Sequence, residues 1–295
     1  MDRYTVDRYA ELVMKAIMTG SGLLIVLITA QLTVKSLPII RSSTLTALLL
    51  SPRWYPLRGE FGFYTFIIGT LIVTALAMMI ATPISVLAAV YLSEYASRRV
   101  RGLVKPLIDI LAGIPSVVYG LWGITLIVPI VRYNVAPMFG ASTTGYCVLS
   151  AAVVLAIMVF PIIISVAEEV LNAVPDEMRE TSLALGATKW QTVKYIVLKE
   201  SSVGMLASVI MGFSRAFGET MAVMMVVGNV AKVPETVFDS AYPLPALIAN
   251  NYGEMMSLPL YDSALMFTAL ILLVVVGGFT VATHVLQRRL RGLKR

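Results

Sequence analysis

Four long stretches of this 295-residue chain contain no Asp, Glu, Lys or Arg, and they constrain its fold more than any other feature. The stretches run from Phe61 to Ser93, from Ile110 to Val131, from Tyr133 to Ala167 and from Ser263 to Gln287. A helix needs about 20 predominantly apolar residues to cross a bilayer. The segments 17–34 and 201–227 are two further candidates, although the second contains two charges. The sequence therefore predicts an all-α, multi-pass membrane protein with six spanning helices.

The distribution of charge predicts how these helices are oriented. Of all residues 58% are hydrophobic and 14% charged, which excludes an ordinary soluble domain. Most of the 23 Lys and Arg residues lie before residue 16, in the loops 93–106 and 168–200, and after residue 287. By the positive-inside rule these segments are cytoplasmic. We therefore expect a plasma-membrane protein with both termini in the cytoplasm, and we assign the net charge of +6 to membrane topology rather than to nucleic-acid binding.

The first apolar segment has two possible fates. A secretory signal peptide has a short basic start and a small-x-small cleavage site. Here the preceding tail is long and contains Asp2, Asp7 and Glu11, and no clear cleavage site follows the apolar residues. We expect this segment to remain in the protein as the first span.

The residue composition argues against catalysis and metal binding by this chain. Cys147 and His284 are the only cysteine and the only histidine, which leaves little material for a metal site or a nucleophile–base pair. No G-x-x-x-x-G-K-[ST] loop occurs, so ATP would have to bind to another chain. We expect no enzyme activity, no metal and no cofactor in this chain.

Arg215 and Glu219 are the exception to the apolar pattern of the fifth span. Each such charge at the centre of a spanning helix costs about 2.5–3.5 kcal/mol on insertion scales. In a continuous helix, residues four apart share one face. The spacing therefore predicts either an arginine fork that meets an anion in a pathway, with Glu219 holding the empty guanidinium, or a structural ion pair between neighbouring helices.

The loop 168–200 is predicted to form two helices joined by a glycine turn. Pro175 suits a first helical turn and is followed by acidic residues, which the positive end of the helix dipole favours. Gly186 suits a helix end, and Thr188 with Gln191 forms a capping-box pattern for a second helix through Lys199. Such a unit is either simple surface packing or a docking surface for a partner.

Proline and glycine mark further irregularities. Gly113 and Pro115 in the third span and Pro161 in the fourth predict kinks. The segment 233–260 contains four prolines around an apolar centre that is too short to cross a bilayer, which predicts a re-entrant or interfacial element.

Several stretches of the sequence carry a family resemblance. The loop resembles the coupling motif of ABC-importer permeases, because the spacing from Glu180 to Gly186 and from Gly186 to Ile196 is kept. Thr181 and Ser182 replace its two alanines, and Lys199 replaces its final proline. The stretches 54–71, 90–123 and 213–229 resemble C-type permease subunits of phosphate-specific transport (Pst) ABC importers; they read WYPLRGEFGFYTFIIGTL, VYLSEYASRRVRGLVKPLIDILAGIPSVVYGLWG and FSRAFGETMAVMMVVGN.

The resemblance implies a type I ABC importer permease fold and a role in phosphate import. It implies a sister A-type permease, a cytoplasmic ATPase dimer that binds ATP and Mg, and an extracytoplasmic phosphate-binding protein as partners. It places Arg215 and Glu219 in the substrate pathway. The ATPase contacts would be Glu180, Leu183, Gly186 and Ala187.

The resemblance also divides the chain into three parts. Residues 1–64 would form the N-terminal tail, first span and outer loop, residues 65–287 the permease core with its coupling loop at about 168–200, and residues 288–295 a basic cytoplasmic tail. Permeases for molybdate or sulfate, and secondary transporters that work without an ATPase, remain as alternatives.

Overall fold

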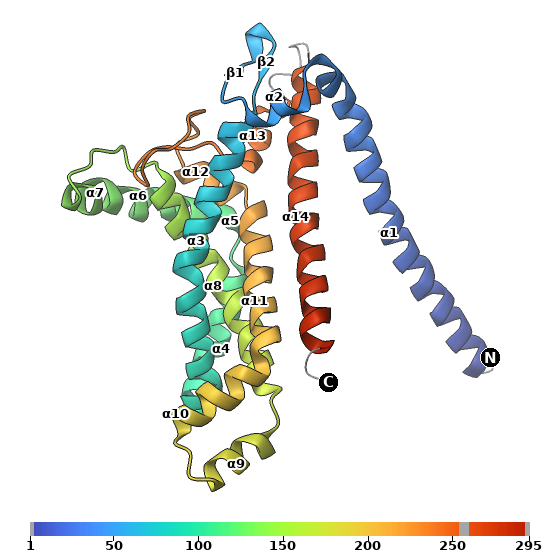
Figure 1. Ribbon diagram of the computed structural model, residues 1–295, viewed down its shortest axis with the longest axis vertical. Helices are drawn as coiled ribbons and strands as arrows, with labels where there is room; N and C mark the ends of the chain where they lie inside the picture. The colour runs from blue at the N-terminus through green and yellow to red at the C-terminus, as the bar shows by residue number, and fades with distance from the viewer. Residues whose placement is uncertain (1–2, 254–259, 293–295) are drawn as a thin grey trace.

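The computed structural model describes residues 3–253 and 260–292 as a helical bundle (Figure 1). Within these ranges six helices are long and apolar enough to cross a membrane. They are Asp7–Ser42, Tyr64–Tyr95, Ser116–Met138, Val148–Asn172, Lys189–Gly218 and Tyr261–Val281.

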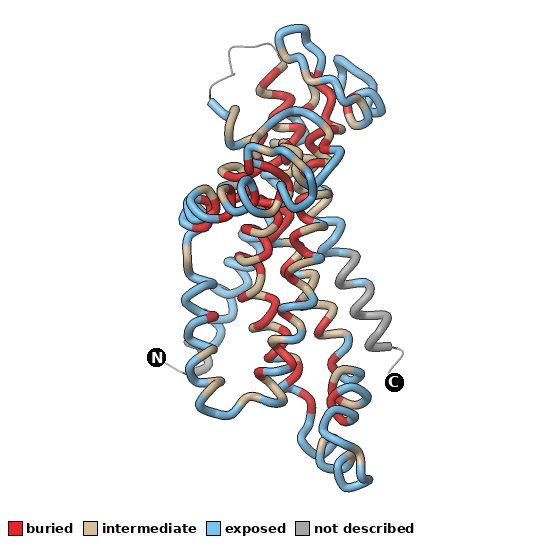
Figure 2. Tube along the Cα trace, turned by 90° about the vertical axis from the view of Figure 1, so that its left-hand side faces the viewer, coloured by how far each residue is buried: buried red, intermediate tan, exposed pale blue. Residues whose placement is uncertain are grey.

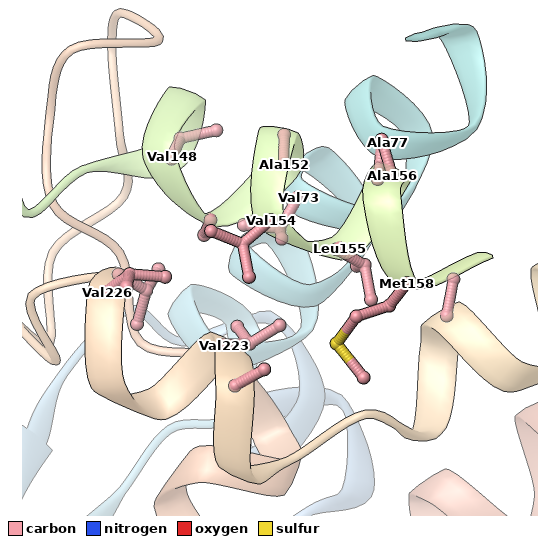
Figure 3. Close-up of a cluster of buried hydrophobic side chains, with 14 of the residues drawn as sticks. Val73, Ala77, Val148, Ala152, Val154, Leu155, Ala156, Met158, Val223 and Val226 are labelled. Carbon is pink, nitrogen blue, oxygen red and sulfur yellow. The ribbon is translucent and has the colours of Figure 1, made fainter. Parts of the chain in front are cut away.

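The centre of the bundle is formed by α3 (Tyr64–Val90), α8 (Val148–Asn172) and α11 (Leu198–Gly218). These helices come from the uncharged stretches and from the segment with Arg215, and α8 is buried along much of its length. Figure 3 shows Ala77 of α3 beside Ala156 of α8, and Val73 near Val154, with Val223 and Val226 on the adjoining segment of the same cluster. Both α3 and α8 contain an internal proline, Pro83 and Pro161, and the helix continues through each of them.

The first helix is longer than its apolar core. The sequence predicts a span at 17–34, whereas α1 runs over Arg3–Ser42, because the polar residues on both sides continue the helix. Near its end α1 meets α14 (Tyr261–Gly292): the Ile39 N–H donates to Ser263 Oγ at 3.0 Å, and Lys35 Nζ lies 3.9 Å from Asp262 Oδ2. The beginning of α1 and the end of α14 lie at the same end of the bundle (Figure 1).

The opposite end is closed by short elements around an aromatic cluster. The Trp54 ring lies edge-on to Phe61, Phe63, Phe66 and Tyr261, at centroid distances between 4.8 and 6.0 Å. This cluster fixes an antiparallel hairpin to the ends of the spans. The elements are α2 (Leu45–Leu50), β1 (Trp54–Tyr55), η1 (Pro56–Arg58), β2 (Glu60–Phe61) and α13 (Leu244–Asn251).

The apolar centre of the segment 233–260 lies in α13 at this closed end. Leu244 and Leu247 are buried there, and α13 packs against α3 and α14. Its eight residues are too few to cross a bilayer. The part of the segment at 254–259 lies outside the described residues.

The third span is interrupted rather than merely kinked. The sequence predicts one helix over 110–131, but α4 ends at Gly113 and α5 begins at Ser116 after the cap residue Pro115. Proline disfavours the helical conformation of the residue before it, which explains the break at Ile114. The elements after the break extend sideways from the bundle (Figure 1). They are α5 (Ser116–Trp122), η3 (Gly123–Ile127), α6 (Val128–Ile130), η4 (Val131–Val135) and α7 (Ala136–Met138), whereas α4 (Arg98–Gly113) precedes the break and lies within the bundle.

Close approach of α11 to α8 depends on small residues at four-residue spacing. Gly204, Ser208 and Gly212 lie on one face of α11. A Cβ at Gly212 would lie 2.6 Å from Ile163 Cγ1, and a Cβ at Gly204 would clash with the side chain of Val170. Small residues at i and i+4 are a common solution to helix packing in membranes because they bring backbones together.

We predict that Gly212→Ala destabilises the protein by about 1–3 kcal/mol, as expected for overpacking. Thermal unfolding of the purified full-length protein would show a lower Tm. The matched control is Gly102→Ala in α4, where a Cβ meets nothing within 4 Å. Alanine favours a helix over glycine, so the control is expected to be neutral or slightly stabilising. Equal Tm values for the two variants would contradict the prediction.

Candidate functional site: a broken helix and a projecting loop

The fifth span breaks between Arg215 and Glu219. Helix α11 ends at Gly218, Glu219 caps it with an extended backbone (φ −69°, ψ 125°), and α12 (Met221–Val226) begins after Thr220. The prediction of one continuous helix through residue 227, with both charges on one face, is therefore wrong. Glycine has a low helix propensity, and the Glu219 carboxylate accepts a hydrogen bond from the Ala222 N–H at 3.4 Å, so local interactions favour the break.

Arg215 lies in the last turn of α11 and is exposed. A cation at this position interacts favourably with the negative end of the helix dipole, by about 0.3–1 kcal/mol at an exposed site. Its guanidinium lies within electrostatic range of Tyr119 in α5. Among the described residues, no hydrogen bond or ion pair engages Arg215, and none joins it to Glu219. The structure therefore contains no Arg215–Glu219 ion pair within this chain.

Glu219 faces a different environment. It is partly buried and lines a narrow space within the bundle, together with Thr70 and Val73 of α3, Leu155 of α8 and Val223 of α12. Its carboxylate stands at the start of α12, where a helix dipole favours negative charge. Glu219 therefore stabilises the break and the start of α12, whereas Arg215 is exposed on the surface.

The two broken spans meet beside Arg215. Helices α5 and α12 pack against each other, and both begin directly after a break. The Tyr119 hydroxyl donates to the Leu111 carbonyl at 2.8 Å and so joins the two halves of the third span. The end of α11 lies well inside the length of the bundle (Figure 1). The Arg215 cation, which has no ion-pair partner among the described residues, therefore lies near the breaks of both the third and the fifth span.

The projecting loop at the other end follows the predicted pattern. Helix α9 (Asp176–Ala184) begins after the cap residue Pro175, and Gly186 has a φ of +84°, a conformation that favours glycine. Thr188 and Gln191 form both hydrogen bonds of the capping box. The second helix continues beyond the predicted limit of Lys199, because α10 (Lys189–Thr192) and the π-helical turn η5 (Val193–Val197) lead directly into α11.

This loop has the features of a docking surface. Figure 2 shows it as mostly exposed at the lower end of the molecule. An apolar groove of about 510 Å³ runs along it. Leu185, which lines the groove, is 85% exposed and presents its apolar side chain to the surroundings. The groove is lined by Glu177, Met178, Thr181, Ser182, Leu185, Ala187 and Ile196.

The structure separates the four predicted contact residues. Ala187 lines the groove, Gly186 forms the exposed turn, Leu183 lines a different cavity, and Glu180 is exposed on α9. Sequence reasoning missed Met178 and Leu185; an apolar side chain on a short, otherwise polar helix was the available signal. In the described part of the chain no group of three or more His, Cys, Asp or Glu residues could hold a metal ion. The side chain of His284 lies outside the described set.

The fold and these two features define a class of protein, a multi-pass membrane protein with two broken spans and a projecting helical loop. Comparison with known families agrees: the family of binding-protein-dependent transport system inner membrane components matches residues 81–292. The chain is 36% identical to the phosphate transport system permease protein PstC of Xylella fastidiosa, over 81% of this chain and 78% of that protein. It is 35% identical to the probable ABC transporter permease protein YqgH of Bacillus subtilis, over 82% and 77%.

The chain therefore belongs to the binding-protein-dependent transport system inner membrane components and, among them, to the C-type permease subunits. Solved structures show the same fold. A chain of the MetNI methionine ABC transporter has a TM-score of 0.58 at 21% identity, covering 75% of this chain and 92% of that one. A chain of a bacterial ABC transporter for alginate import has a TM-score of 0.63 at 12% identity, covering 98% and 99%. The fold is that of a type I ABC importer permease.

Proposed function

We propose that this chain is the permease subunit of an ATP-driven phosphate importer, and that Arg215 meets the anion in its pathway. The observation that carries the proposal is the exposed guanidinium of Arg215, unpaired among the described residues, beside two helix breaks. A charge inside a spanning segment is commonly part of a substrate pathway. The choice of phosphate as substrate is supported by the similarity to PstC, a phosphate transport system permease protein.

The chemistry of Arg215 suits phosphate. Arginine stays charged at every relevant pH and presents a planar fork of donors that matches phosphate oxygens. Because the guanidinium has no carboxylate partner among the described residues, its donors are available to an entering anion. Glu219 acts in this proposal by holding the break that sets the position of Arg215, and its negative charge nearby keeps anion binding weak enough for release.

The exposure of Arg215 favours a pathway formed by two chains. A spanning charge on the surface of one permease needs a polar wall opposite it, and a sister A-type permease would supply that wall. This chain would then form half of the pathway.

The projecting loop supports coupling to a separate ATPase. We infer that the ATPase dimer, which would hold ATP and Mg, binds the groove along α9 and the turn at Gly186, with Glu180, Leu183 and Ala187 at its margins. The basic loops, the beginning of α1 and the end of α14 lie at this end of the bundle, which supports a cytoplasmic location for them. The hairpin end would then face the phosphate-binding protein outside the plasma membrane.

Purification with associated subunits tests this proposal. We expect the chain to copurify with a second permease and an ATPase, and phosphate-loaded binding protein to stimulate ATP hydrolysis in proteoliposomes. Sulfate and molybdate, with their own binding proteins absent, are expected to have no effect. Uptake of phosphate with no associated ATPase would indicate a secondary transporter. Stimulation of ATP hydrolysis by another oxyanion would show that this oxyanion, and not phosphate, is the substrate.

A further inference from the structure

Two arginines at the loop end of the bundle make crossed contacts with the ends of the second and fourth spans. Arg101 of α4 donates to the Leu92 and Ser93 carbonyls in the π-helical turn η2 (Tyr91–Tyr95), and its Nε lies 3.8 Å from Glu168 of α8. Arg101 thus caps the second span and faces a carboxylate of the fourth.

Arg179 of α9 makes the reverse contacts: it caps the end of the fourth span and pairs with a carboxylate of the second. It donates to the Leu171 and Val174 carbonyls at the end of α8, and its Nη2 lies 2.9 Å from Glu94 Oε1 in η2. The side chains of Arg179 and Glu94 are only 16% and 8% exposed, whereas the second acidic partner, Asp176, is 89% exposed. Breaking a buried pair leaves an uncompensated charge, so the contact with Glu94 is the stronger constraint.

Arg179 also attaches α9 to the ends of the second and fourth spans. No residue of α9 is buried, although the helix contacts α10 and η5, so polar contacts contribute much to its position. Ser182 joins α9 to α10 through Thr192, with 3.0 Å between their hydroxyl oxygens, but it does not reach the second span. A cavity of about 710 Å³, lined by Glu94, Arg179 and Lys189 among others, lies between α9–α10 and the ends of the spans. The ion pair bridges an otherwise open space.

We propose that the Glu94–Arg179 ion pair is the positioning contact through which α9 and the end of the second span move together during transport. The inference rests on the proposed function, because it needs an ATPase that displaces α9. A displacement of α9 would then reach η2 and α3, which packs along α8 and α11 in the centre of the bundle. Glu94 and Arg179 act through the helices that they join and do not contact substrate.

The test uses the complete transporter in proteoliposomes and measures the ATP hydrolysed per phosphate imported. We expect Glu94→Gln, which keeps the shape of the side chain, and Arg179→Gln each to raise this ratio by about tenfold, with the double variant no worse than the worse single one, as for residues that act as one unit. Arg179→Lys keeps the charge but not the fork, so an intermediate ratio is expected. Asp176→Asn removes the exposed partner of the same arginine and is expected to leave the ratio unchanged.

The outcomes separate this inference from the proposed function. If the wild-type complex imports no phosphate, the proposed function fails. If it does import phosphate and assembled Glu94→Gln complexes keep the wild-type ratio, the ion pair has no role in coupling. Reduced assembly of all variants with an unchanged ratio in the complexes that remain would overturn the inference in the same way.

A second measurement does not depend on transport. Spin labels at Tyr91→Cys and Ala184→Cys, both exposed positions, report the separation of η2 and α9, while the native Cys147 is buried. We expect one narrow distance distribution in the assembled complex and a broader one after Glu94→Gln. Equal widths would show that the pair does not fix α9 to the second span.

Discussion

Arg215→Ala is expected to abolish phosphate uptake while the transporter still assembles. Hydrogen bonds to charged groups contribute about 1.5–3 kcal/mol each, so losing two of them lowers uptake by about 100-fold or more. The guanidinium is exposed and contacts no other described residue through a hydrogen bond or ion pair, so its removal leaves no buried group unsatisfied. Phosphate uptake into proteoliposomes and the yield of the purified complex measure the two effects separately.

Arg41→Ala is the matched control for this experiment. Arg41 is also an exposed arginine in the last turn of a long helix, but it lies at the hairpin end of α1, far from the breaks in the third and fifth spans. Its removal is expected to leave uptake within about twofold, since exposed charges usually contribute little. Normal uptake by Arg215→Ala, or an equal loss of uptake in both variants, would show that Arg215 does not act in the substrate pathway.

Glu219 is tested by two substitutions with different expected results. Glu219→Gln keeps an oxygen that can accept the hydrogen bond from the Ala222 N–H, whereas Glu219→Ala loses it and leaves the start of α12 uncapped. If Glu219 acts by holding the break, uptake falls strongly in the alanine variant and much less in the glutamine variant. Equal loss in both would instead assign the function to the carboxylate charge.

The sequence predicted those features that arise from local interactions. Uncharged length predicts the number of spans, and the Thr188 capping box and the Gly186 turn follow from a few neighbouring residues. The interruption at Pro115 was signalled by proline, although its extent was underestimated. In each of these cases the residues that determine the structure lie within one or two turns of it.

Features that depend on residues far apart in the sequence could not be predicted. The break at Gly218 is a local feature that was nevertheless missed, because the segment is apolar and of ordinary spanning length and so suggested a continuous helix with an Arg215–Glu219 pair. A buried pair that the structure does contain, Glu94 with Arg179, joins residues 85 positions apart. The groove at Met178 and Leu185 likewise depends on how α9 lies against η5. These contacts depend on how side chains are placed in the folded chain, which the spacing of residues in the sequence does not reveal.

Gly186→Trp is expected to uncouple ATP hydrolysis from phosphate uptake. A Cβ at Gly186 meets nothing within 4 Å, so the indole would project into the space where the ATPase is proposed to bind. The positive φ of +84° adds strain of about 1–2 kcal/mol for most residues, so this substitution changes the turn as well as its surface. We expect uptake to fall at least about tenfold, the equivalent of 1.4 kcal/mol or more, while hydrolysis no longer responds to the binding protein.

Gly186→Asn separates the steric effect of the indole from backbone strain. Asparagine adopts the left-handed conformation more readily than other non-glycine residues and has a small side chain. If the ATPase packs against this turn, the asparagine variant keeps most of the uptake and the tryptophan variant does not. Copurification of the ATPase with each variant shows whether docking itself is lost. Normal uptake and normal stimulation in Gly186→Trp would contradict the docking assignment, and equal losses in both variants would show that only the conformation of the turn matters.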